Sequence, residues 1–233
     1  MVVIARLRLP LFLVLAALTA LLSGVGSTAA MGAFAATDDL GTPRSGHSAI
    51  LLGDDRVLVS GGFSGDSPTA STEIYDIAAG TFSPGPDMSV ARSGHHLVPL
   101  PDGTVLILGG WTGTTATASV DLFDPASDTI TPAAPMLGTR SNPGATLLVD
   151  GTVLVAGGSD DFNTGDPIAS VELYDRATDA FTSVPALSTP RALHTASLLR
   201  DGSVLFFGGD ALAGGSAELY DLSLASAPVR RHR

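Results

Sequence analysis

The stretch RSGHHLVPLPDGTVLILGG, from Arg92 to Gly110, is one of four similar copies in this 233-residue chain. An arginine precedes an apolar segment, a tight turn returns the chain, and a second apolar segment ends at two glycines. The other copies lie at Arg44–Gly62, Arg140–Gly158 and Arg191–Gly209, so successive copies start 48, 48 and 51 residues apart. Self-similarity with a period near fifty residues is typical of the blades of a β-propeller.

Each unit predicts two strands joined by a tight turn. In three units an Asp-Gly pair makes the turn, because glycine adopts the required positive φ at little cost. These pairs are Asp102-Gly103, Asp150-Gly151 and Asp201-Gly202. The first unit has Asp54-Asp55 there, which is a poorer turn. The second strand is continuously apolar, as expected for a strand that is covered on both faces.

Each unit also predicts a third strand, in which acidic residues alternate with leucine or isoleucine and so give two unlike faces. The third strands are expected at Ser71–Asp76, Ser119–Asp124, Ser170–Asp175 and Ser216–Asp221. A fourth strand opens with Phe82, Ile130 or Phe181, whereas the last unit lacks such a residue. We therefore expect an all-β chain of four visible four-stranded blades, in a ring that is small or incomplete. The units lie at about 43–90, 91–138, 139–189 and 190–226.

The repeat resembles the kelch motif in four features. These are the arginine, the apolar strands, the diglycine, and the aromatic pair of the third and fourth strands. The resemblance extends from Pro43 to Leu222. It implies a kelch-type β-propeller over residues 43–226, after a short linker at 36–42 and before a basic tail at 227–233. Kelch propellers generally use five to seven blades. Four visible units thus indicate a small ring, an incomplete ring, or a fragment of a larger kelch protein.

The N-terminus has the pattern of a signal peptide. Arg6 and Arg8 precede an apolar run from Leu9 to Leu22, and small residues follow with A-x-A-like sites ending at Ala29 and Ala35. A run of this length is short against the roughly 20 residues that span a bilayer. We expect residues 1–35 to be a signal peptide and processing region. The mature protein is then secreted or periplasmic, with no stable membrane insertion after cleavage.

The composition argues against several classes of function. The formal net charge is −11, and all 12 basic residues are arginine. Such a surface repels phosphate backbones, so no nucleic-acid partner is expected. The chain contains no cysteine, which excludes disulfides and thiolate metal sites. Copper chemistry of the galactose-oxidase kind, which uses a Tyr–Cys crosslink on a kelch propeller, is therefore not supported.

Several residues recur at fixed places and are interpreted as scaffold. One arginine and one acid recur in every unit, which suggests one bidentate ion pair per blade. The pairs are Arg44, Arg92, Arg140 and Arg191 with Glu73, Asp121, Glu172 and Glu218. A cationic ring for an anionic ligand is the alternative. The diglycines mark close approaches of two backbones, and they are Gly61-Gly62, Gly109-Gly110, Gly157-Gly158 and Gly208-Gly209. His47, His95 and His194 stand three residues after an arginine, and repetition favours a structural role over a metal ring.

The loops after the diglycines differ between units and are the candidate binding elements. The first begins with Phe63 and the second with Trp111, the only tryptophan, which either anchors a ligand or caps the diglycine. The third loop is the longest and carries Asp160, Asp161, Asn163 and Asp166. These oxygens suit Ca²⁺, but the order of residues is not that of an EF-hand, so a solvated acidic loop is preferred and no cofactor or metal is expected.

The combined pattern predicts an exported binding module rather than an enzyme. In an up-and-down blade the diglycine loops and the arginine segments emerge at one end, and the Asp-Gly hairpins at the other. Variable loops on a rigid scaffold are where binding is usually located, so the loop end should contact a protein or glycan outside the cytoplasm. The alternative is a carbohydrate-active enzyme, an isomerase or oxidase. Open blade edges predict a ring closed by a segment near Asp39–Pro43 or Ala225–Val229, or self-association.

Overall fold

The computed structural model describes residues 34–161, 166–209 and 214–221. The chain divides into two compact units, Met1–Ala36 and Thr37–Arg233, and the first is described only at residues 34–36. The expected signal peptide therefore lies almost wholly outside the described residues. Within the described ranges there is no helix, and hence none that is long and apolar enough to cross a membrane.

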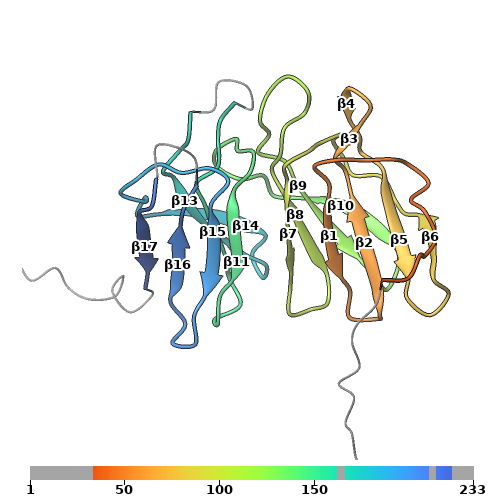
Figure 1. Cartoon of the computed structure of the whole chain (residues 1–233). Coiled ribbons are helices and arrows are strands. Elements are labelled where there is room, and N and C mark those ends of the chain that lie inside the picture. Colours follow the sequence, from red (N-terminus) through yellow and green to blue (C-terminus); the bar gives the residue numbers. More distant parts are fainter. Residues whose placement is uncertain (1–33, 162–165, 210–213, 222–233) are drawn as a thin grey trace, which may run out of the picture. The chain divides into compact units, whose positions relative to one another are not determined.

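The described part of the second unit contains four antiparallel sheets of three or four strands, one for each sequence repeat (Figure 1). A further two-stranded sheet joins β3 (Phe63–Ser64) to β4 (Ser67–Pro68) in the first loop. The first sheet has the order β1 (Ser48–Leu51), β2 (Arg56–Ser60), β5 (Thr72–Asp76) and β6 (Thr81–Pro84). The second contains β7 (His96–Pro99), β8 (Val105–Leu108), β9 (Val120–Asp124) and β10 (Thr129–Ala133). The third contains β11 (Gly144–Leu147), β12 (Val153–Ala156), β13 (Val171–Asp175) and β14 (Ala180–Val184). The fourth has three described strands, β15 (Thr195–Leu198), β16 (Val204–Phe207) and β17 (Ala217–Tyr220).

These sheets confirm the expected all-β fold of four-stranded blades for the first three units. Each third strand begins one residue later than predicted, and the last one also ends one residue earlier. Glycines 103, 151 and 202 have φ of 87 to 89° in the hairpin turns, as the Asp-Gly pairs predict. In the first unit Asp55 takes the same place with φ of 62°, a conformation that aspartate adopts more readily than most residues.

Neighbouring sheets pack through the two faces of their second strands. Val105 of β8 lies in an apolar cluster with Leu58 of the preceding sheet, whereas Leu106 lies in a cluster with Val153 of the following sheet. All four residues of β8 are buried. This two-sided burial is the physical reason for the continuous apolar runs. The innermost strands contact one another in series, β1 with β7, β7 with β11, and β11 with β15.

The recurring arginine holds each blade together from inside. The Arg92 side chain is fully buried, and its Nη1 donates to the carbonyls of Gly109 and Ser119 at 3.0 and 2.9 Å. Its Nη2 donates to Ser119 Oγ at 2.7 Å and to Asp121 Oδ2 at 3.1 Å. One guanidinium thus joins the end of the second strand to the start of the third. Corresponding bonds are made by Arg44, Arg140 and Arg191.

The acid of each pair also binds the link that enters the blade. Glu218 accepts the amides of Ser188 and Thr189 at 2.6 and 3.0 Å, together with Nη2 of Arg191 at 2.8 Å. Burial raises the pKa of Glu218, but these hydrogen bonds outweigh it and lower the pKa to about 2. Asp121 is one methylene shorter, and its Oδ1 finds no hydrogen-bond partner within the described ranges.

The diglycines join each blade to the next one. A Cβ on Gly109 would lie 2.4 Å from the carbonyl oxygen of Arg140, and the amide of Gly110 donates to that oxygen at 2.9 Å. The same contacts link the first blade to the second and the third to the fourth. At Gly208, in the last sheet, a Cβ would meet no atom within 4 Å. The described part of the fourth sheet therefore lacks a neighbour on that side.

Ring closure within the chain does not follow the expected route. Residues 39–43 form no strand, and the amides of Gly41 and Thr42 bind Glu73 of the first sheet. The prediction that this segment completes a blade within its own chain is therefore wrong for the described structure, because those amides serve as the link into the first blade. The alternative segment, residues 225–229, lies outside the described residues.

Arg140→Lys should lower the free energy of unfolding by about 2–4 kcal/mol, because an ammonium cannot replace the planar fork that holds two carbonyls, a hydroxyl and a carboxylate. Urea unfolding measures the loss. Arg176→Lys is the matched control, since the Arg176–Asp102 pair is 39% and 42% exposed and should contribute less than about 1 kcal/mol. Equal, small losses in both variants would contradict the structural role of Arg140.

Candidate functional site

The four arginine segments, residues 44–47, 92–95, 140–143 and 191–194, meet at one end of the innermost strands. The third residue of each has a positive φ, between 49 and 61°. These residues are Gly46, Gly94, Asn142 and Leu193. The Gly94 amide donates to Gly46 O at 3.3 Å, and the Asn142 amide to Gly94 O at 2.8 Å. Backbone bonds between successive blades thus position the first three segments side by side.

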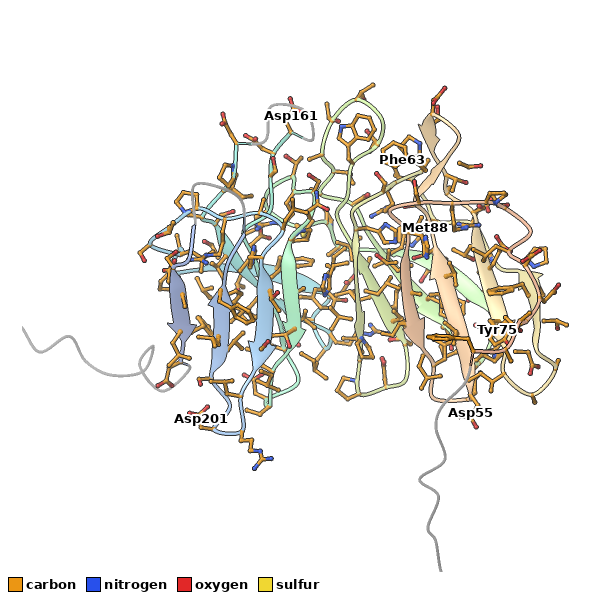
Figure 2. All side chains as sticks on the ribbon, viewed as in Figure 1. Asp55, Phe63, Tyr75, Met88, Asp161 and Asp201 are labelled. Atoms are coloured by element: carbon orange, nitrogen blue, oxygen red, sulfur yellow. The ribbon has the colours of Figure 1, made fainter. Side chains whose placement is uncertain are left out.

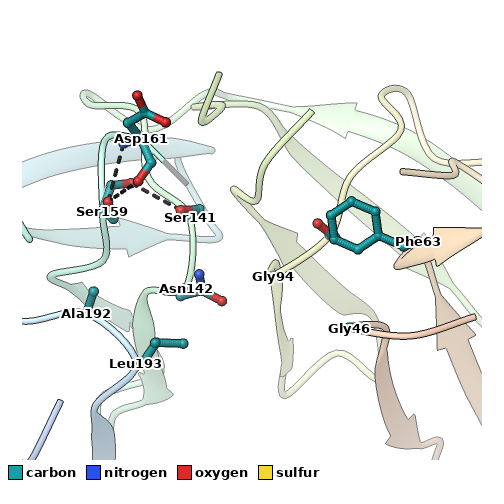
Figure 3. A pocket seen from close by; sticks show the side chains of 10 residues that line it. Gly46, Phe63, Gly94, Ser141, Asn142, Ser159, Asp161, Ala192 and Leu193 are labelled. Carbon is teal, nitrogen blue, oxygen red and sulfur yellow. Dashed lines mark hydrogen bonds between the residues drawn. The ribbon is translucent and has the colours of Figure 1, made fainter. Parts of the chain in front are cut away.

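These segments line a cavity of about 390 Å³, here called the axial pocket (Figure 3). All four repeats contribute to it. Its lining comprises Gly46, Phe63, Ser93, Gly94, Ser141, Asn142, Ser159, Asp161, Ala192 and Leu193. The lining is mostly apolar, with a few hydroxyls and one carboxylate. Among these hydroxyls, Ser93 Oγ is buried without a hydrogen-bond partner in the described structure.

The diglycine loops and the arginine segments lie together, as predicted, because Phe63 and Asp161 of the loops line the same pocket as Gly46 and Asn142. Figure 2 shows Phe63 and Asp161 at the opposite end of the sheets from Asp55 and Asp201, which mark the hairpins. The two ends of the blades therefore differ in chemistry. The loop end contains the pocket, whereas the other end carries short hairpins.

Trp111 is a structural residue rather than an exposed anchor. Its side chain is only 9% exposed, and its backbone exchanges hydrogen bonds of 2.8 and 3.0 Å with Ser93. Its ring lies 5.7 Å from the ring of Phe63, which belongs to the preceding blade. Of the two alternatives for Trp111, this low exposure favours the one in which the indole caps the diglycine region. The half-buried Phe63 is left as the aromatic residue at the pocket.

The acidic loop places only one of its carboxylates at the pocket. Asp161 is half-buried there, whereas Asp160 and Asp166 are exposed and Asn163 lies outside the described residues. Ser159 Oγ donates to the carbonyl of Asp161, which folds the start of the loop over the third arginine segment. Among the described residues, no three His, Asp or Glu side chains form a group that could hold a metal ion.

The histidines occupy unlike environments. His95 is buried, and its Nε2 lies 2.7 Å from Ser60 Oγ of the preceding sheet. Burial, and secondarily the charge of Arg92, lowers the pKa of His95 to about 3, so the imidazole is neutral at pH 7. His194 packs against Phe206 with ring centroids 5.8 Å apart, and His47 is exposed. The three histidines therefore differ in burial and in contacts, although they share one place in the repeat.

Leu193 is the residue that the sequence interpretation missed. It combines a φ of 57° with a side chain that is 71% exposed at the axial pocket. The left-handed conformation costs an L-residue roughly 1–2 kcal/mol, and the other three units use glycine or asparagine there. The signal was present in the alignment of the units, as the only large side chain in a column of Gly, Gly and Asn.

The comparison with protein families bears on these same repeats. The model of the kelch motif matches residues 43–89 and 140–188, which contain the first and third sheets with their arginine segments. These two segments match the kelch motif. The second and fourth units share the arginine–acid pair and the diglycine with them. No curated protein matches the chain. Kelch repeats form β-propeller modules that generally mediate protein interactions.

The free energy of unfolding should fall as the pH drops from 7 to 5, because unfolded His95 binds a proton with a pKa near 6.5 and the buried ring does not until about pH 3. A folded-state pKa below the unfolded value means that stability is present above pH 6.5 and is lost below it. His95 alone should contribute about 2 kcal/mol over this interval.

Urea midpoints at several pH values measure this dependence. Burial also lowers the pKa of His96, so His95→Gln isolates the share of His95 by flattening the profile. Parallel profiles for the wild-type chain and the variant would show that His95 does not titrate differently on folding.

Proposed function

We propose that this chain is an extracytoplasmic protein-interaction module that receives an apolar side chain of its partner in the axial pocket. The single observation that carries the proposal is Leu193, a large exposed side chain held in an unfavourable backbone conformation at a pocket lined by all four repeats. Backbone strain that the surrounding structure maintains is often associated with function. The pocket lies among the variable loops, where a rigid scaffold usually carries its binding residues.

A protein partner fits the pocket better than a glycan does. Phe63, Ala192 and Leu193 present carbon to the pocket, and the glycines add only backbone. The centres of protein interfaces are typically apolar with polar groups at the rim. Ser93 Oγ and Asp161 supply such polar groups beside the apolar lining. A peptide segment with an aliphatic or aromatic residue next to a backbone amide or a cation matches this arrangement.

Leu193→Gly should weaken partner binding about tenfold while leaving the free energy of unfolding unchanged or raising it by up to about 1 kcal/mol. Glycine relieves the left-handed strain, at some entropic cost in the unfolded chain, and removes the apolar contact. The measurement compares quantitative capture of proteins from the extracytoplasmic fraction by the wild-type and variant chains, with a glycan array as a parallel assay.

Val149→Ser is the matched control, because Val149 is equally exposed, at 71%, but adjoins the hairpin turn at Asp150. It should leave capture unchanged. If Val149→Ser abolishes binding and Leu193→Gly does not, the working face is the hairpin end. Capture of glycans alone would reassign the pocket to carbohydrate.

Export is the second part of the proposal and is supported by the charge and hydropathy pattern of residues 1–35. When the full coding sequence is expressed in a bacterium, the chain should be recovered outside the cytoplasm with a new N-terminus between Ala29 and Asp38. Intact-mass measurement identifies that terminus. A chain that retains Met1 and sediments with membranes would contradict cleavage.

A further inference from the structure

We propose that the axial pocket selects a cationic segment of its partner, in which an aliphatic or aromatic residue lies next to a lysine or an arginine. This selectivity rests on the proposed function, because it concerns the partner that enters that pocket. Three observations carry it: a buried hydroxyl in the pocket that has no partner, the distribution of charge between the two ends of the sheets, and the burial of the repeat arginines.

The pocket contains a buried polar group that the free chain leaves unpaired. Ser93 is only 1% exposed and lines the axial pocket, and its Oγ has no hydrogen-bond partner in the described structure. The equivalent Ser141 Oγ donates to the carbonyl of Ser159 at 3.4 Å, and the fourth unit has Ala192 at this place. A buried hydroxyl without a partner is costly, so Ser93 Oγ is expected to gain one when a ligand fills the pocket.

Asn142 supplies a second polar side chain to the pocket. It is half-buried, and its side-chain amide makes no hydrogen bond to the other residues that line the pocket (Figure 3). A Cβ on Gly94 would lie 2.6 Å from Oδ1 of Asn142, so the amide rests against the neighbouring arginine segment. The hydroxyl of Ser93 and the amide oxygen of Asn142 are both acceptors for the N–H groups of an ammonium or a guanidinium.

The loops at this end of the sheets are acidic. Asp161 is half-buried and lines the pocket, while Asp66, Asp160 and Asp166 are exposed on the first and third diglycine loops. Negative charge beside an apolar pocket attracts a cationic partner and repels an anionic one. An apolar side chain with a neighbouring cation therefore matches the pocket, since the apolar group meets the carbon of the lining while the cation lies towards Asp161.

No arginine in the described part of the chain offsets this charge at the loop end. The side chains of the four repeat arginines have no exposed surface, and each is paired with the acid of its own blade. The other described arginines belong to the hairpin end, where Arg56 and Arg176 form ion pairs with hairpin aspartates and Arg200 directly precedes a hairpin turn. The chain has no lysine. The repeat arginines are thus not available to an anionic ligand.

The arrangement of the lining suits a lysine or arginine side chain as well as its apolar neighbour. Figure 3 shows Phe63 on one side of the pocket and Leu193, Asn142 and Asp161 on the other. The stems of lysine and arginine are aliphatic and pack against apolar surface while the charged tip keeps polar partners. The face of a phenylalanine ring also attracts a cation. A segment between the two sides therefore meets carbon, an aromatic ring, an amide and a carboxylate.

The probe is a random-peptide display library that is selected on the purified exported chain, followed by synthesis of the selected peptides. These peptides should combine an aliphatic or aromatic residue with a neighbouring lysine or arginine. Replacing that cation by glutamine should weaken binding about tenfold, and Asp161→Asn should reduce this difference to less than about threefold. Fluorescence polarisation measures the affinities. A library that yields no peptide above background overturns the proposal, and so do selected peptides that are neutral or acidic.

Asp55→Asn is the matched control for charge. It removes one carboxylate at the opposite end of the sheets (Figure 2), and asparagine readily adopts the φ of 62° found there. The preference for the cationic peptide over its glutamine version should be unchanged in this variant. An equal loss of preference in Asp55→Asn and Asp161→Asn would mean that the peptides respond only to the net charge of −11, which overturns selection by the pocket.

Ser93→Ala and Asn142→Gly test the two polar groups with residues that other units already carry at these places, alanine in the fourth unit and glycine in the first two. Each variant should weaken binding of the cationic peptides about threefold to tenfold. Ser93→Ala should not lower the free energy of unfolding, because the buried hydroxyl has no partner to lose. Unchanged peptide binding in both variants would overturn the placement of the cation in the pocket.

Leu193→Gly separates this selectivity from the proposed function. If it weakens binding of selected peptides that turn out to be neutral or acidic, the axial pocket is the binding site and only the cation is wrong. If cationic peptides bind Leu193→Gly as tightly as they bind the wild-type chain, the axial pocket is not their site, and the proposed function fails together with the selectivity.

Discussion

The buried arginine of each repeat is the interaction on which the rest of this structure depends. Its side chain is inaccessible in all four blades, and its guanidinium joins the end of the second strand to the start of the third and to the carboxylate of the third strand. A buried ion pair is stable only when its remaining donors and acceptors are bonded, and here main-chain carbonyls and link amides complete the bonding. The backbone carbonyl of Arg92, Arg140 and Arg191 meanwhile accepts the amide of the preceding diglycine. One residue thus ties a blade together and attaches it to its neighbour.

This fixed framework explains why the loop end can vary. The arginine segments are held by bonds that do not involve the third residue's side chain, so that residue is free to be glycine, asparagine or leucine. The loops after the diglycines begin from equally fixed points and differ in length and charge. The backbone around the axial pocket is therefore similar in every repeat. The chemical character of the pocket depends on the side chains that differ between repeats, among them Phe63, Asp161 and Leu193.

The sequence predicted the period, the strand order and the arginine–acid pairs, because these depend on contacts within one repeat and recur four times. The sequence did not determine whether Trp111 is buried or exposed, because its ring packs against Phe63 of the preceding unit. The strain at Leu193 is visible only when the four units are compared, because Gly46, Gly94 and Asn142 indicate positive φ at a place where a leucine alone does not. The unequal histidines follow likewise from what each neighbouring blade presents, such as Ser60 to His95.

The identical boundaries between blades make this unit a one-dimensional array whose ends are unlike its interior. At each internal boundary one face of a sheet is buried against the opposite face of the next sheet. Each added repeat adds one more boundary of the same kind. The apolar surface left at the terminal sheet, at Phe207 and Leu219, does not shrink with added repeats. The free-energy cost of this exposed apolar surface is constant, so the cost per blade falls as the number of blades rises. Covering that surface therefore stabilises a short array more, per blade, than a long one.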